Sequence, residues 1–205
     1  FDAQPLSMTT LAKSFPAVPL RGEFSGPLKV SGTLQDLWLV TDLSSEAGRM
    51  EADVRIDAEA PRYRLTGEPR VTQFDPQVAF NDLTVPSGEL TARFLADIRG
   101  DSLADLEGSA SVVVDRSTLS GVRIFAGDAR MRFADGRALV DTLHLETTAI
   151  ELDAAGAIGL HAGRTDSITV RARADSLGGF RRWLASSATD SLAATSRISR
   201  RNVGR

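Results

Sequence analysis

The two histidines, His144 and His161, are the side chains best suited to hold a metal or move a proton. Neither has a second histidine or a carboxylate at the spacing of a zinc motif such as H-E-x-x-H, and the chain contains no cysteine. His144 alternates with Leu143 and Leu145, which places it on the polar side of a strand. We interpret it as a solvated strand residue, and we predict no metal site.

Acid–base catalysis and cofactor binding find no support in the sequence. The carboxylates recur as polar partners of apolar residues, whereas a catalytic pair lies apart among apolar residues that raise its pKa. No G-x-S-x-G, P-loop or G-x-G-x-x-G motif is present, and Gly156-Ala157-Ile158-Gly159 lacks the rest of a dinucleotide fingerprint. We predict a protein that is not an enzyme and uses no cofactor.

Charge and hydropathy narrow the classes of partner. The net charge is −3, and aromatic residues make up 6% of the chain and are dispersed, so neither a basic surface nor a base-stacking platform for nucleic acid is indicated. The sequence contains no run of about 18 apolar residues, which is the length that a membrane-spanning helix needs. Because the sequence begins at Phe1 rather than Met, we expect a processed or partial chain.

The elements that must carry any function are amphipathic strands. Apolar and polar residues alternate over residues 50–58, 90–98 and 168–174, with Leu95 the one exception. This period of two places the apolar residues of each segment on one side of a half-buried strand. The predicted apolar face comprises Met50, Val54, Ile56, Leu90, Phe94, Ile98, Ile168 and Val170.

Shorter segments complete a mostly β fold. Alternation also favours strands over residues 28–34, 63–65, 110–114, 122–133, 139–145 and 150–160. Asp135-Gly136 separates two of them and is a dipeptide typical of tight hairpin turns. Glycines fall mostly at strand edges, as a meander with short connections requires. We predict an antiparallel sheet, either a meander or an open, sandwich-like arrangement.

Helix is scarce in the sequence, and short helices are expected at the two ends of this sheet. Residues 1–18 form a lead-in with a helix from Pro5 to Lys13, residues 19–177 form the sheet domain, and residues 178–205 form a helix and a basic tail. Residues 181–205 contain six arginines and the single Asp190, a local charge of +5. We predict docking on a partner protein or on anionic headgroups through Phe180, Arg181, Arg182, Trp183, Arg197, Arg200 and Arg201.

Two stretches resemble a known family. Residues 22–37 follow the pattern G-x-x-x-G-x-L-x-x-x-G-x-L-x-D-L, which is similar to the phrasing of the AsmA-like and TamB-type bacterial envelope proteins. Residues 115–158 resemble the strand, hairpin and strand succession of the same family, ending in an A-x-G-x-L-like segment. The resemblance implies an elongated, strongly curved sheet with an apolar concave face, a membrane-associated periplasmic location in a Gram-negative-type bacterium, and a role in lipid transport or envelope assembly.

Two functions therefore stay open at the level of sequence. In the first, the apolar face covers lipid acyl chains. In the second, the protein is an accessory scaffold subunit of a large inner-membrane complex, for example a respiratory or photosynthetic assembly. The shortness of the chain and its basic tail favour the second function, whereas the family resemblance favours the first.

Overall fold

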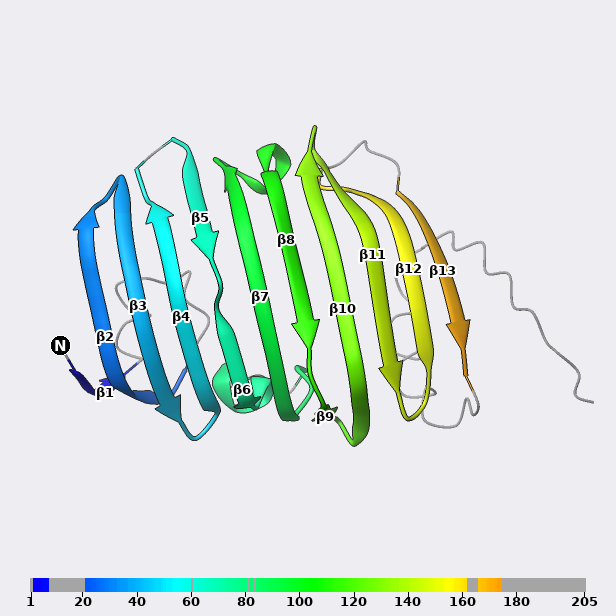
Figure 1. Ribbon diagram of the computed structural model, residues 1–205, viewed down its shortest axis with the longest axis horizontal. Coiled ribbons are helices and arrows are strands. Elements are labelled where there is room, and N and C mark those ends of the chain that lie inside the picture. Colours follow the sequence, from blue (N-terminus) through cyan, green and yellow to red (C-terminus); the bar gives the residue numbers. More distant parts are fainter. Residues whose placement is uncertain are drawn as a thin grey trace, which may run out of the picture.

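The protein forms a single-layered antiparallel sheet. The computed structural model describes residues 2–7, 21–59, 61–80, 82, 84–161 and 166–174. Figure 1 shows the strands side by side, nearly in chain order. They are β1 (Asp2–Ser7), β2 (Glu23–Thr33), β3 (Asp36–Ser45), β4 (Gly48–Asp57), β5 (Tyr63–Gly67), β6 (Arg70–Phe74), β7 (Gly88–Gly100), β8 (Glu107–Val114), β9 (Ser117–Leu119), β10 (Val122–Ala134), β11 (Arg137–Thr147), β12 (Glu151–Gly159) and β13 (Ser167–Arg173).

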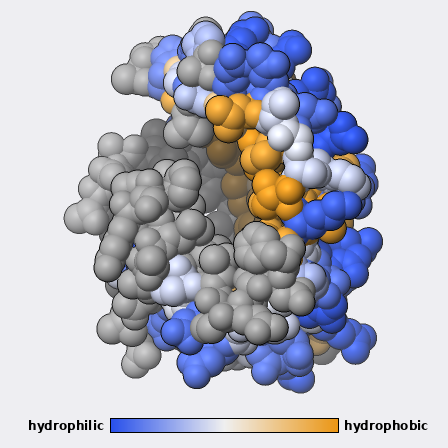
Figure 2. All heavy atoms as spheres, turned by 90° about the vertical axis from the view of Figure 1, so that its left-hand side faces the viewer, coloured by the Kyte–Doolittle hydropathy of each residue, from blue (hydrophilic) through white to orange (hydrophobic). Residues whose placement is uncertain are grey.

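The topology is a meander in which two positions are each occupied by an interrupted strand. β5 and β6 both lie between β4 and β7, and β8 and β9 both lie between β7 and β10. Every strand pair among the described residues is antiparallel, as successive strands joined by short turns must be. The sheet is curved, and Figure 2 shows hydrophobic residues lining its hollow side. The predicted mostly β, curved antiparallel architecture is confirmed.

The predicted hairpin at Asp135-Gly136 is also confirmed. These two residues connect β10 to β11, and both have positive φ, 51° for Asp135 and 67° for Gly136. Positive φ at both central residues is the geometry that matches the right-handed twist of the flanking strands. Ala134 and Arg137 pair directly across the turn.

A small core lies at one end of the sheet, where the helix α2 (Pro76–Phe80) packs (Figure 1). Asp75 caps the start of this helix: its carboxylate accepts hydrogen bonds from the backbone N–H groups of Gln77 at 2.9 Å and Val78 at 3.3 Å. Pro76, the first helical residue, has no backbone N–H that would need a hydrogen-bond acceptor. The buried cluster consists of Phe24, Leu43, Ala47, Phe74 and Ala79.

The structure corrects one expectation about the ends of the chain. Pro5, Leu6 and Ser7 belong to β1, so the helix predicted to begin at Pro5 does not begin there. β1 pairs with the first part of β2, with Leu6 opposite Phe24, and this pairing outweighs the local preference for a helical turn. Residues 8–13 and the predicted helix at 177–185 lie outside the described residues.

Candidate functional site

The apolar residues of successive strands lie in register across the whole sheet. One row starts at Val30 on β2 and ends at Ile168 on β13, and each member pairs with the next across neighbouring strands. Its members share one property, since each is apolar or glycine. They are Val30, Leu39, Val54, Gly67, Ala96, Ala110, Met131, Val140, Gly156 and Ile168.

A second row connects Phe94 with Val170 through β8, β10, β11 and β12. Its intermediate members are Val112, Ala129, Leu143 and Ala154. We call the surface formed by these two rows and by the parallel row from Leu37 through Ile56, Leu65 and Ile98 the inner face. It is the hollow, hydrophobic side of the sheet in Figure 2.

The inner face keeps large side chains in contact with solvent. Val30 is 47% exposed, Phe94 38%, Ile168 42% and Val170 52%, whereas Val54 and Val140 in the same rows are buried. Thr41 also lies on this face, but its hydroxyl donates to the carbonyl of Pro27 at 3.1 Å and leaves no unpaired polar group. An apolar surface of this extent on one side of a sheet is typical of a binding face.

The structure brings the sequence-predicted apolar residues onto this one face. Met50, Val54 and Ile56 on β4 and Leu90, Phe94 and Ile98 on β7 are joined through Leu65, which pairs with both Ile56 and Ile98. Ile168 and Val170 lie on the same face at the far edge of the sheet. The predicted docking residues Phe180, Arg181, Arg182, Trp183, Arg197, Arg200 and Arg201 lie outside the described residues.

Sequence reasoning missed the contribution of β3 to the inner face. Leu37, Leu39 and Leu43 of this strand belong to it, but Trp38 and Val40 between them are also hydrophobic and hide the alternation. Trp38 points to the opposite side, where its indole N–H donates to the Asp53 carboxylate at 2.7 Å. The apolar run from Leu37 to Val40, bounded by Asp36 and Thr41, was the available signal.

The opposite side of the sheet, which we call the outer face, is polar and carries cross-strand ion pairs. Arginines lie beside carboxylates in the pairs Arg49–Asp42, Arg55–Asp36, Arg64–Asp97, Arg99–Glu107, Arg132–Asp141 and Arg173–Glu151. Hydrogen bonds from the Arg132 guanidinium lower the pKa of Asp141, and those from Arg49 lower the pKa of Asp42. All of these pairs are at least partly exposed, so they contribute little to stability.

His144 lies on the outer face in β11, two strands from the β13 edge. It lies between Asp128 of β10 and Asp153 of β12, and its Nδ1 is 2.9 Å from an Asp153 carboxylate oxygen. The possible ligand atoms of His144, Glu151 and Asp153 lie within 4.8 Å of one another, which is compatible with a cation. Glu151 is, however, also paired with Arg173 at 3.3 Å, so these groups already satisfy one another.

Comparisons with known proteins add no family or relative. No family model, no curated protein and no solved structure matches the chain. Within the described part of the chain, no helix is long and apolar enough to cross a membrane.

Proposed function

We propose that the protein is a non-enzymatic, membrane-associated module of the periplasm, similar to AsmA and TamB proteins, whose inner face covers lipid acyl chains during lipid transport or envelope assembly. The observation that carries this proposal is the unbroken apolar row from Val30 to Ile168. A ligand that lies along this row meets no side chain that can form hydrogen bonds. This suits a hydrocarbon chain and disfavours a polar metabolite.

The energetics favour an apolar occupant. Each methylene group moved from water to an apolar surface gains about 0.8 kcal/mol, so a chain of several methylenes along a row gains enough for binding. The exposed inner-face residues Val30, Phe94 and Val170 would lose their own contact with water at the same time. Both contributions are apolar, and binding is therefore expected to be insensitive to salt.

Two neighbouring residues allow a matched test. Phe94 and Leu95 are 38% and 51% exposed and point to the inner and the outer face, respectively. We expect the full chain to bind a fluorescent fatty acid saturably, and Phe94→Gln to weaken this binding about tenfold, because a large apolar contact is lost. Leu95→Gln should leave it unchanged. Absence of saturable binding, or equal weakening by the two variants, would contradict the proposal.

A scaffold role in an inner-membrane complex is the second candidate function, and the edge strand β13 favours it. All seven residues of β13 are exposed, and among the described strands it pairs with β12 alone. An edge of this kind can accept a strand from a partner protein. Native mass spectrometry after extraction in mild detergent separates the two roles, since co-purifying lipid supports acyl-chain binding and a stoichiometric membrane complex supports the scaffold.

A further inference from the structure

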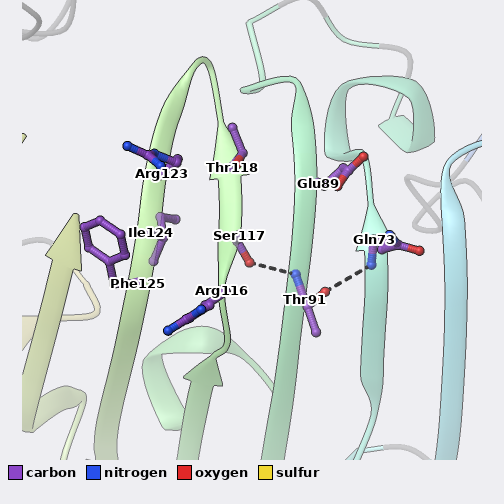
Figure 3. A pocket seen from close by; sticks show the side chains of 9 residues that line it. All are labelled: Gln73, Glu89, Thr91, Arg116, Ser117, Thr118, Arg123, Ile124 and Phe125. Atoms are coloured by element: carbon purple, nitrogen blue, oxygen red, sulfur yellow. Dashed lines mark hydrogen bonds between the residues drawn. The ribbon is translucent and has the colours of Figure 1, made fainter. Parts of the chain in front are cut away.

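A recess of about 520 Å³ opens on the outer face, at the end of the sheet where β7, β9 and β10 meet (Figure 3). Arg116 and Arg123 line it together with Thr118, Phe125 and Glu89. Glu89 and Thr91 alternate with Leu90 and Ala92 of the inner face, which places the recess on the opposite side from the acyl-chain surface. Binding in this recess would therefore be independent of acyl-chain binding on the inner face.

Irregular strand pairing creates this recess. β8 ends at Val114 and β9 begins at Ser117, so Arg116 lies in the break between them. β10 has a register shift between Ile124 and Ala126 beside Phe125. Such breaks and bulges turn side chains away from the regular pleat, and they are frequent next to binding sites.

Hydrogen bonds hold the floor of the recess in place. The hydroxyl of Ser117 accepts the backbone N–H of Thr91 at 2.9 Å (Figure 3). It also donates to the carbonyl of Asp115 at 2.8 Å. The hydroxyl of Thr91 accepts the backbone N–H of Gln73 at 3.2 Å. These bonds join β6, β7 and β9, so the backbone that carries Arg116 is fixed at one end.

The recess brings two arginines without an ion-pair partner into one place. Neither Arg116 nor Arg123 has a carboxylate within 4.0 Å among the described residues, and both line the same recess. Some other arginines of the outer face, such as Arg130 and Arg171, also lack such a partner among the described residues. Glu89 and Arg123 pair with Thr118 from opposite sides, so their backbones lie two strand spacings apart, about 9–10 Å. No ion pair joins their side chains. Two exposed guanidinium groups are therefore left to meet an anion.

We propose that Arg116 and Arg123 form a binding site for a phosphate-type anion. The guanidinium group is planar and offers paired N–H donors whose spacing matches two phosphate oxygens. The Thr118 hydroxyl, two residues after Arg116 and directly opposite Arg123, supplies a further donor. Phe125 is 41% exposed, and its ring lies 6.0 Å from the Arg123 guanidinium carbon, so it orients that group and presents an apolar neighbour to the ligand.

A phosphate group can reach this site as a free anion or as a phospholipid headgroup, and the experiment separates the two. Titration of the full chain with inorganic phosphate, followed by nuclear magnetic resonance, should shift the backbone amide signals of β9 and the start of β10. Vesicles of phosphatidylcholine with and without phosphatidylglycerol then test the headgroup in a co-sedimentation assay. Binding to phosphatidylglycerol vesicles that is lost in the arginine variant identifies a headgroup site, whereas phosphate binding without vesicle binding identifies a free-anion site.

The variants make the assignment specific. The double variant Arg116→Gln, Arg123→Gln should weaken phosphate binding at least tenfold, and Glu89→Gln should strengthen it by removing a negative charge from the recess. Arg171→Gln is the matched control, because Arg171 is also an exposed arginine of a strand but lies on β13, far along the sheet. Wild-type affinity in the double variant, or equal loss in the control, would overturn the proposal; unchanged circular dichroism spectra establish that the variants are folded.

Discussion

Nδ1 of His144 lies 2.9 Å from Oδ1 of Asp153 and so joins β11 to β12 on the outer face. The hydrogen bond to this carboxylate raises the pKa of His144 above its ordinary value of 6.5, and the charges of Asp128 and Glu151 act in the same direction. Because the folded-state pKa is the higher one, protonated His144 stabilises the fold fully below pH 6.5, and this contribution is lost as the pH rises through the folded-state pKa.

We therefore expect the His144 ring signals to titrate above pH 6.5 in nuclear magnetic resonance spectra. Asp153→Asn should move the midpoint down towards 6.5 because it removes the main acceptor. Asp36→Asn, which removes an exposed carboxylate near the other edge of the sheet, should not change the midpoint. An unshifted histidine in the wild-type chain would contradict the pairing.

Phe24 anchors the small core between the sheet and α2, where its side chain is fully buried. Replacing it by alanine should lower the free energy of unfolding by about 3–5 kcal/mol, because the change removes a buried ring and leaves a cavity. Urea denaturation followed by circular dichroism measures this loss. Phe94→Ala is the comparison, and we expect a clearly smaller cost, since Phe94 is already 38% exposed.

Gly108 and Gly121 both have positive φ but differ in their surroundings. A Cβ atom at Gly108 would press against the backbone of Asp97 and Ile98 on β7, whereas a Cβ atom at Gly121, in the turn between β9 and β10, meets nothing within 4 Å. Gly121→Ala should cost about 1–2 kcal/mol from the backbone conformation alone. Gly108→Ala should cost more, because strand pairing must also yield, and equal losses in urea denaturation would argue against the close approach.

Strict alternation was sufficient to predict the strands that build most of the inner face. In β4, β7 and β13 the apolar residues occupy every second position, so the sequence alone assigns Met50, Phe94 and Val170 to a common kind of surface. Pairing register then decides whether these surfaces join. That information depends on which strands are neighbours, and the sequence predicted only the general meander, because the interrupted strands β5 with β6 and β8 with β9 leave no local signal.

The alternation of apolar and polar residues could not predict some other elements of the fold. β6 and β9 are short and continue the positions of β5 and β8, so neither has enough residues to show a period of two. The helix α2 has five residues, and its one clear signal is the capping sequence Asp75-Pro76. Arg116 and Arg123 line one recess through the β9–β10 hairpin combined with the break before β9 and the bulge in β10, and no local pattern encodes that break or bulge.

The meander has a consequence for how the chain folds. Because each described strand pairs with strands that lie close to it in sequence, most connections between paired strands are short, and the relative contact order is low for a sheet of this size. Strands emerging during synthesis can therefore add one at a time to those already paired. The growing edge is always the most recent strand, and the sheet never has to wait for a distant segment to complete it.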